Sequence, residues 1–286
     1  MQHSGGMSET LRYAAFTSDP ATGNPAGVVL DADDLDDDRM QKIAADVGYS
    51  ETAFVRRTEG GDRRFGLRFF SPLAEVAFCG HATIATSVAL AEREGTGPLV
   101  FDTPAGTIDV TTGARPSGVV ASLRSVPTST RPASPDELRQ ALNALGWSAS
   151  DLDPTFPAHV AFAGNHHLVL ASGTRSRLAE LSYDFDQLKA VMTEHGWTTV
   201  QLFWQQDDRT IHSRNPFPVG GVVEDPATGA AAAALGGYLR ALGRIAGTRR
   251  IMIIQGEDMG RRSELEITVD VDDPRVIVSG TAIVIK

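Results

Sequence analysis

Three side chains that could carry proton-transfer chemistry stand where predicted strands and helices begin. Glu51 opens an otherwise apolar strand beside a glycine-containing turn, where a desolvated carboxylate is a good general acid or base. His81 stands at a helix start, where a neutral imidazole can donate or accept a proton, and Asp225 lies just ahead of a second helix start. Spacing alone leaves ordinary alternatives open: a surface charge for Glu51 and helix caps for the other two.

Cys79, two residues before His81, is the only cysteine of the chain. A helix N-terminus lowers a thiol pKa, so a nucleophile is one interpretation and a small buried residue is the other. One cysteine excludes an intramolecular disulfide and a cysteine zinc cluster, which fits a reducing cytoplasm. We expect no metal site at His166 and His167, because neighbouring side chains of a strand point to opposite faces.

Two predicted helix N-termini could serve as an anion site. Backbone N–H groups are unpaired there, the helix dipole is positive, and glycine permits close approach. The two sequences are Gly80-His81-Ala82-Thr83 and Thr228-Gly229-Ala230-Ala231. Facing each other across a cleft between two halves, they could hold a small carboxylate and stabilise an enolate-like charge. Either motif alone is weak, because glycine before a helix is also a common packing or capping device.

The elements that must position these residues recur in a similar order along the chain. In the first half, the hydrophobic pattern and the turn residues predict strands at 11–16, 28–30, 51–56, 64–70, 99–102, 107–112 and 119–123, a turn at 24–27, and helices at 36–47 and 80–93. The second half predicts helices at 134–145, 184–194 and 230–242, and strands at 159–162, 167–170, 198–205, 210–213, 264–271 and 275–285. Each half therefore wraps strands around one small-residue central helix.

We expect two domains, residues 8–118 and 119–274, with the last strand, 275–286, either completing the first or belonging to the second. Residues 1–6 are interpreted as an expression scar ahead of a native start at Met7. The net charge of −10 disfavours nucleic acid and anionic membranes as partners, and no apolar run is long enough to span a bilayer. The acidic run between Asp31 and Asp38 is interpreted as a solvated helix start, with a divalent-metal site as the weaker alternative.

Several motifs taken together resemble the PhzF-like family, named for a phenazine-biosynthesis isomerase. They are Gly23-Asn24-Pro25-Ala26-Gly27-Val28, Ser50-Glu51-Thr52-Ala53-Phe54-Val55, Phe70-Ser71-Pro72 with Glu75, Cys79-Gly80-His81-Ala82-Thr83, Glu224-Asp225-Pro226-Ala227-Thr228-Gly229, and Gln255-Gly256 with Met259-Gly260-Arg261. The resemblance spans nearly the whole chain. It implies an α+β, diaminopimelate epimerase-like fold of two pseudo-symmetric domains. Each would be a curved, mostly antiparallel sheet around a central helix, with the active site between them.

The resemblance also implies roles for residues. Glu51 would move a proton between carbons of a small carboxylic-acid substrate without a cofactor, and His81 and Asp225 would help bind and polarise that substrate. The further substrate-binding residues expected are Asn24, Ser50, Cys79, Gly80, Ala82, Thr83, Thr228, Gly229 and Ala230. The resemblance further implies a cytoplasmic biosynthetic enzyme and a homodimer.

Related racemases of this fold use two cysteines, one at each helix start. Cys79 is similar to the first, but the matching second motif reads Asp225-Pro226-Ala227-Thr228-Gly229 and contains no thiol, which excludes two-thiol racemisation. Ala82 stands where the phenazine enzyme of the family has proline, and Ala230 stands where many relatives have serine. These differences suggest a different substrate. Our leading hypothesis is thus an isomerase acting on an unsaturated acid. A lyase or cyclase-type reaction at the same cleft and a non-catalytic small-acid binder stay open as alternatives.

Overall fold

The computed structural model describes residues 9–59, 61–116 and 118–286, and the segment interpreted as a scar, residues 1–6, lies outside these. The chain forms two compact units. Unit 1 comprises the described residues up to Leu123 together with Gly280–Lys286, and unit 2 comprises Arg124–Ser279. The units divide between Leu123 and Arg124, whereas the sequence placed the boundary between residues 118 and 119, and the last strand is divided between the units.

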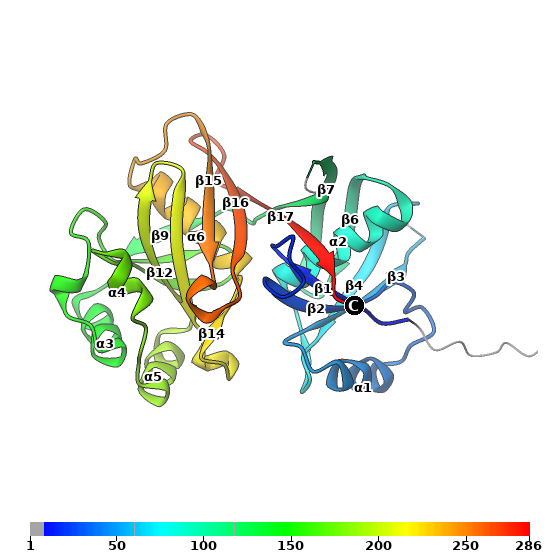
Figure 1. Ribbon diagram of the computed structural model, residues 1–286, viewed down its shortest axis with the longest axis horizontal. Coiled ribbons are helices and arrows are strands. Elements are labelled where there is room, and N and C mark those ends of the chain that lie inside the picture. Colours follow the sequence, from blue (N-terminus) through cyan, green and yellow to red (C-terminus); the bar gives the residue numbers. More distant parts are fainter. Residues whose placement is uncertain (1–8, 60, 117) are drawn as a thin grey trace, which may run out of the picture. The chain divides into compact units, whose positions relative to one another are not determined.

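Unit 1 is a sheet that closes on itself around one helix. Its elements are β1 (Leu11–Ala15), β2 (Asn24–Val29), α1 (Asp37–Val47), β3 (Thr52–Arg57), β4 (Arg64–Phe70), β5 (Glu75–Val76), α2 (Gly80–Glu94), β6 (Gly97–Thr103), β7 (Gly106–Arg115) and β8 (Gly118–Arg124). The strand order is β1-β2-β3-β4-β6-β7-β8, and the end of β17 (Val276–Val284) pairs with both β8 and β1. Helix α2 contacts β1, β2, β3 and β7 inside this sheet, whereas α1 packs on β3 and β4 (Figure 1).

Unit 2 repeats this construction. Its elements are β9 (Ser129–Pro132), α3 (Pro135–Leu145), β10 (His159–Phe162), β11 (His166–Ala171), α4 (Arg175–Ala179), α5 (Phe185–His195), β12 (Trp197–Asp207), β13 (Thr210–Pro216), β14 (Glu224–Asp225), α6 (Gly229–Ala241), β15 (Thr248–Gln255), β16 (Ser263–Asp270) and the start of β17. The strand order is β9-β10-β11-β12-β13-β15-β16-β17. The amides of Ser125 and Thr128 bond the carbonyls of Val276 and Pro274, each at 2.8 Å, which brings the two ends of this order together.

The two units share one pattern of strand directions. In unit 1 the pairs β2–β3 and β4–β6 are parallel, and in unit 2 the matching pairs β11–β12 and β13–β15 are parallel. The neighbouring pairs β1–β2, β3–β4 and β6–β7 are antiparallel, as are β10–β11, β12–β13 and β15–β16. The mostly antiparallel, pseudo-symmetric α+β fold expected from the sequence is therefore confirmed.

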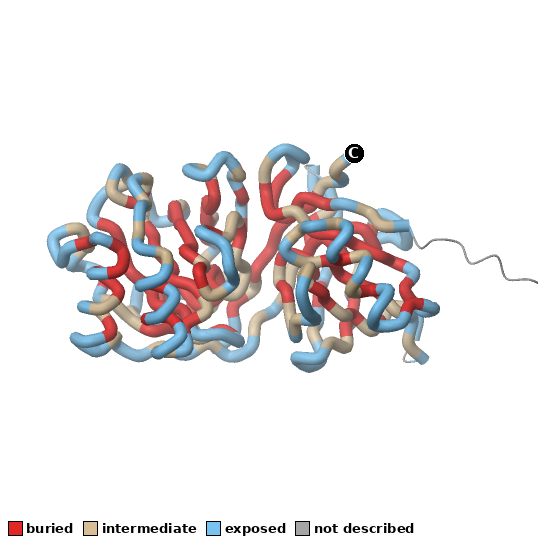
Figure 2. The backbone as a smooth tube through the Cα atoms, turned by 90° about the horizontal axis from the view of Figure 1, so that it is seen from below, coloured by how far each residue is buried: buried red, intermediate tan, exposed pale blue. Residues whose placement is uncertain are grey.

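Small side chains let each sheet close tightly on its central helix. In α2 every residue from His81 to Ala91 is buried, and in α6 every residue from Ala231 to Leu239 is buried. Figure 2 shows this buried backbone inside each unit. A helix covered on all sides needs short side chains wherever strands come close. The Gly, Ala, Ser and Thr residues that dominate both helices meet that need.

A bidentate ion pair fixes the hairpin that leads into each central helix. The Arg68 guanidinium bonds Glu75 through Nε at 2.7 Å and Nη2 at 2.8 Å. The Arg214 guanidinium bonds Glu224 in the same manner, at 2.9 and 2.6 Å. Each arginine stands two residues before the strand residue that pairs with its glutamate, Phe70 in one unit and Pro216 in the other. The pairs β4–β5 and β13–β14 are thus built alike.

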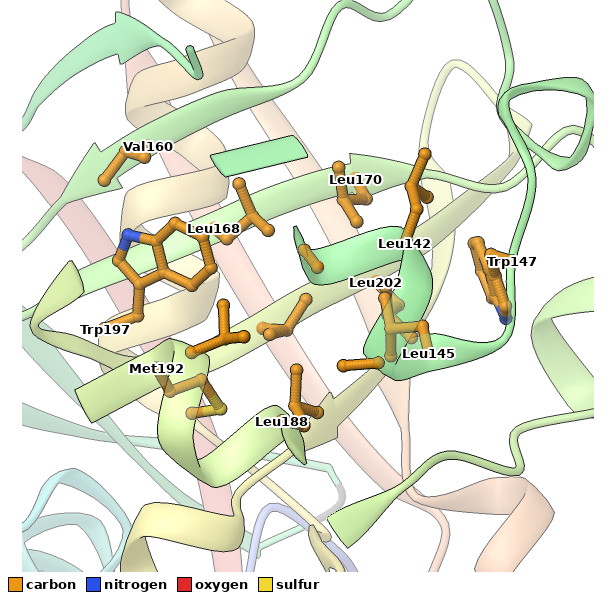
Figure 3. Close-up of a cluster of buried hydrophobic side chains, with 14 of the residues drawn as sticks. Leu142, Leu145, Trp147, Val160, Leu168, Leu170, Leu188, Met192, Trp197 and Leu202 are labelled. Carbon is orange, nitrogen blue, oxygen red and sulfur yellow. The ribbon is translucent and has the colours of Figure 1, made fainter. Parts of the chain in front are cut away.

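The outer helices of unit 2 cover its sheet with an apolar layer. Leu168, Leu170, Val200 and Leu202 of the sheet pack against α3 and α5 residues such as Leu188 (Figure 3). The predicted helix starts are confirmed by their caps. Ser134 forms a capping box with Glu137, and the side chains of Asp36 and Asp184 accept from the amides three residues on.

Some expectations from the sequence were wrong or incomplete. The turn predicted at 24–27 lies within β2, and the chain instead reverses before it, where Gly23 takes a φ of +69°. The short elements β5, β9, β14 and α4 were missed, as was β15, which carries the apolar run Ile251-Met252-Ile253-Ile254. Among the described residues, no helix has both the length and the apolarity that crossing a membrane requires.

A buried polar network lies in the sheet of unit 2. His167 Nδ1 is 2.8 Å from the Thr199 hydroxyl, which donates to Asn215 Oδ1 at 2.8 Å, and Asn215 Nδ2 donates to Gln201 Oε1 at 2.7 Å. His167 is fully covered, and its Nε2 has no hydrogen-bond partner among the described residues. Burial, with the neighbouring His166, lowers the pKa of His167 from 6.5 to about 3.

The close approach at Gly237 gives a first prediction. A Cβ there would lie 2.3 Å from the Thr128 hydroxyl, which cannot retreat easily because it bonds Arg240 and the Pro274 carbonyl. Gly237→Ala should therefore destabilise unit 2 by about 1–3 kcal/mol, although alanine is the better helix former. Urea unfolding followed by tryptophan fluorescence suits the test, because all three tryptophans lie in unit 2. Gly173→Ala, also in unit 2, is the control, because its Cβ would make only ordinary van der Waals contacts of 3.4 Å or longer, and equal costs would contradict the argument.

The two ion pairs give a second prediction, because they differ in burial. The side chains of Arg214 and Glu224 are 9% and 3% exposed, against 23% and 35% for Arg68 and Glu75. Glu224→Gln leaves a buried guanidinium incompletely neutralised and should cost about 3–5 kcal/mol. Glu75→Gln should cost about 1 kcal/mol or less, because water replaces the lost contact. Urea unfolding followed by far-ultraviolet circular dichroism reports both variants, and a Glu75→Gln cost as large as that of Glu224→Gln would be evidence against this account.

The buried imidazole gives a third prediction, about pH. Folded His167 stays neutral down to about pH 3, whereas the unfolded chain takes up a proton below its ordinary pKa of 6.5. Stability should thus fall as the pH drops below 6.5, with a contribution from this group of about 2 kcal/mol at pH 5. His167→Gln should lose that part of the decline between pH 7 and pH 5. His166→Gln, at the exposed neighbour, should keep it; an unchanged decline in His167→Gln would refute the assignment.

Candidate functional site

Three of the residues predicted to do chemistry meet in unit 1. Glu51 immediately precedes β3, Cys79 is the N-cap of α2, and His81 is the second residue of that helix. Glu51 Oε2 lies 3.5 Å from His81 Nε2, and the Ser50 hydroxyl lies 3.4 Å from the same nitrogen. The sequence placed these side chains 30 residues apart, and the sheet brings them into contact.

The Cys79 thiol lies beside the imidazole ring. Its Sγ is 3.3 Å from His81 Nδ1 and 3.9 Å from Nε2. A sulfur in line with the Nδ1 lone pair would be much farther from Nε2, so the thiol packs against the ring on its Nδ1 side. This leaves the Nε2 edge of His81 directed toward the carboxylate and the hydroxyl.

The three side chains of the cluster differ in their exposure to water. His81 is 6% exposed and Cys79 is 8% exposed, whereas the Glu51 side chain keeps 20% of its surface. A carboxylate in this position is mostly shielded from water yet can be reached by a small molecule. An imidazole beside it can orient the carboxylate and share a proton with it.

The first turn of α2 adds backbone donors to the cluster. Its N-cap, Cys79, has an extended backbone, and the first helical bond runs from the Thr83 amide to the Cys79 carbonyl at 3.0 Å. The amides of Gly80, His81 and Ala82 therefore precede the first bond of the helix ladder, at the positive end of its dipole. The Thr83 hydroxyl also donates to the Cys79 carbonyl. Thr83, which was predicted to bind substrate, is fully buried.

The corresponding helix start in unit 2 is organised by a glutamine. Thr228 is the N-cap of α6, and its hydroxyl donates to Asp225 Oδ2 at 2.5 Å. Gln255, at the end of β15, accepts from the Thr228 amide at 3.2 Å and donates to the Asp225 carbonyl at 2.8 Å. Gly229 and Ala230 follow as half-buried residues of the first turn. Asp225, Thr228, Gly229 and Ala230 thus lie together, as predicted from their spacing.

Gln255 was quoted in a motif but missed as a site residue. It ends the apolar strand β15 and is 1% exposed, and a single polar residue at a strand end does not by itself indicate such burial. Gly256 follows it with a φ of +75°, and a Cβ there would lie 2.5 Å from the Arg261 carbonyl and 2.8 Å from the Pro226 carbonyl. Only glycine fits that backbone beside the α6 start. Of the remaining predicted residues, Asn24 is buried at the start of β2.

The internal repeat shows what distinguishes the two units. The strand registers align Arg68 with Phe54 and Arg214 with Leu202. Counting back three residues from Phe54 and from Leu202 places Thr199 at the position of Glu51. Comparing the helix starts places Thr228 at the position of Cys79 and Ala230 at that of His81. Unit 1 therefore carries a carboxylate, an imidazole and a thiol where unit 2 has two threonines and an alanine.

The cluster in unit 1 also has the donor types of a metal site. Glu51, Cys79 and His81 each offer one ligand atom, and these three atoms lie within 4.8 Å of one another. The sequence predicted no metal site, and its two adjacent histidines differ as expected, since His167 is buried and His166 exposed.

Known proteins resemble the chain over nearly its whole length. A family model described as phenazine biosynthesis-like protein matches residues 13–286. The uncharacterized isomerase YfhB of Bacillus subtilis is 32% identical over 284 residues, which cover 96% of each chain. The trans-2,3-dihydro-3-hydroxyanthranilate isomerase of Pseudomonas chlororaphis is 35% identical over 250 residues, covering 87% of this chain and 86% of its own.

Solved structures are also similar to the chain over nearly its whole length. A PhzF-family phenazine biosynthesis protein of Bacillus anthracis matches with a TM-score of 0.87 and 27% identity, covering 97% of this chain and 96% of that one. A probable proline racemase of Agrobacterium radiobacter matches with a TM-score of 0.65 at 14% identity, covering 96% and 90%, and shares the fold. The chain thus belongs to the phenazine biosynthesis-like (PhzF) family, and it is an isomerase.

Proposed function

We propose that this isomerase moves a proton between carbons of a small unsaturated carboxylic acid, with Glu51 as the general acid and base. The contact between the Glu51 carboxylate and the His81 imidazole, at 3.5 Å and largely shielded from water, is the observation that carries the proposal. A carboxylate can take a proton from a carbon next to an unsaturated acid and return it farther along the conjugated system. One group then serves both steps.

The absence of a matching acid or base in the repeat supports a single shuttle. The residues of unit 2 that correspond to Glu51, Cys79 and His81 are Thr199, Thr228 and Ala230, none of which ionises near neutral pH. Thr199 is in addition fully engaged by His167 and Asn215. A mechanism with two bases at equivalent positions of the two repeats would need a titratable group at one of these three positions.

The proton transfer leaves negative charge on the substrate, and the first turn of α2 supports its stabilisation. The amides of Gly80 and His81 lie at the positive end of the helix dipole, beside the proposed base. His81 would orient the Glu51 carboxylate and polarise the substrate. In unit 2 we propose Asp225 as a substrate-binding residue, held in place by Thr228 and Gln255.

The substrate class follows from the named relative and from this chemistry. The Pseudomonas chlororaphis relative is an isomerase of trans-2,3-dihydro-3-hydroxyanthranilate, a small unsaturated acid, so that compound is the first probe to use. A product that is an isomer of the probe, and that carries at most one solvent deuterium per turnover in D2O, would support proton transfer. A product that has lost a leaving group would instead support the lyase-type alternative.

The role of Glu51 gives the fourth prediction. Glu51→Gln keeps the size and hydrogen bonding of the side chain but removes the base, so turnover of the probe should fall by about 10²–10⁴-fold or more. Proton exchange followed by nuclear magnetic resonance measures the rate, and circular dichroism checks the fold. Glu194→Gln changes an exposed helical glutamate in the same way and should leave the rate unchanged. Undiminished turnover in Glu51→Gln would remove this residue from the mechanism.

A further inference from the structure

We propose that Glu51, Cys79 and His81 form a binding site for a thiophilic divalent cation of the Zn²⁺ type, which would block the proton-transfer site. Among the described residues this is the one group of three cysteine, histidine or acidic side chains whose ligand atoms converge. Thiolate, imidazole and carboxylate are the three ligand types that proteins use for zinc, and three protein ligands leave a fourth position open. The inference stands on this donor set and holds whether or not Glu51 is the base.

The distances approach those of a tetrahedral centre, which two side-chain rotations would complete. With ordinary zinc–ligand bond lengths, the edges between neighbouring ligand atoms would be roughly 3.4–3.6 Å. His81 Nε2 lies 3.5 Å from Glu51 Oε2 and 3.9 Å from Cys79 Sγ, and the third edge is no longer than 4.8 Å. Closing the site needs the Cys79 side chain to rotate from its place against the imidazole ring toward the Nε2 lone pair, together with a rotation of the more exposed Glu51 side chain.

The identity of the ligand nitrogen follows from the same geometry. Nε2 faces the carboxylate, whereas Nδ1 is closer to the sulfur but has no carboxylate oxygen beside it within the described contacts. A cation bound through Nε2 would therefore meet the carboxylate directly and the thiolate once the Cys79 side chain has rotated. The Ser50 hydroxyl, 3.4 Å from Nε2, lies where it can bond a ligand in the open fourth position.

Other clusters of the described chain suit a cation less well. His212 Nδ1 lies 3.2 Å from Glu257, but Arg175 and Arg262 already neutralise that carboxylate. The acidic run before α1 is spread over separate partners, with Asp36 capping the helix and Asp37 paired to Arg68. Each lacks a thiol, and a soft ligand is what distinguishes zinc-type sites from sites for Ca²⁺ or Mg²⁺.

A bound cation and a proton shuttle exclude each other. Coordination would use the lone pairs of Glu51 and His81 that the isomerisation needs, and it would place a positive charge beside the amides of the α2 start. The metal-bound form should therefore be inactive. The site would make the enzyme sensitive to thiophilic cations and would not make it a metalloenzyme.

The test uses Co²⁺ as a spectroscopic substitute for Zn²⁺, titrated into the full chain carrying His3→Ala so that His3, a further ligand type near the start, cannot contribute. The expected result is saturable binding at one equivalent with a cobalt–thiolate charge-transfer band, reversed by Zn²⁺. Cys79→Ser should abolish that band. Glu51→Gln should keep the band but weaken binding at least about tenfold, since even an outer-shell change costs roughly 10–100-fold in metal affinity.

His212→Asn is the matched control and should bind Co²⁺ like the parent, because its carboxylate partner is already paired. Two results would overturn the proposal: no thiolate band in the parent, or an affinity that Glu51→Gln leaves unchanged. Circular dichroism of each variant shows that the fold is kept. Because Glu51 precedes β3 and is outside the regular elements, its variant remains informative even if Cys79→Ser fails to fold.

Discussion

The burial of one helix inside each closed sheet is the constraint on which the rest of the structure depends. A helix surrounded by strands can carry only small side chains where the strands come close, as Gly237 shows against Thr128. It also has few ways to meet a ligand, since its length is covered. Its N-terminal turn is the exception, because the half-buried Gly80, Gly229 and Ala230 keep that end accessible. The fold therefore directs backbone donors and the positive end of the dipole toward the residues of the candidate site.

The hairpins before α2 and α6 position the N-terminal turns of these two helices. A bidentate arginine–glutamate pair holds β5 against β4 in unit 1, and a second pair holds β14 against β13 in unit 2. The chain therefore enters each central helix at a fixed point. On this shared framework the units have different side chains. Unit 1 gathers Glu51, Cys79 and His81, whereas unit 2 presents Thr228 and Asp225 supported by Gln255. Two units built on one framework therefore carry different side chains at their helix starts.

Local signals in the sequence predicted much of the fold. Capping residues such as Ser134 and Asp36, followed by helical periodicity, located the helices, and the Ala-rich run identified α6 as central. The turn assigned to Asn24-Pro25-Ala26-Gly27 failed because proline and glycine also occur in strands, and β2 forms through pairing with β1 that no local pattern reveals. The family resemblance implied roles for Glu51 and His81, but their contact could not be predicted from the spacing of the two residues, since it depends on how the sheet places β3 beside the start of α2. Gln255 was missed because a buried polar side chain at a strand end has no local signature.

The central claim is that one carboxylate both removes and returns the proton. The most direct measurement is a single-turnover reaction in H2O with a substrate that carries deuterium at the carbon that loses its proton. Because four-fifths of the Glu51 side chain is covered, exchange with water should compete only in part with return of the label. The account predicts that part of the deuterium appears at the second carbon of the product. Complete loss of the label to solvent at every quench time would contradict it.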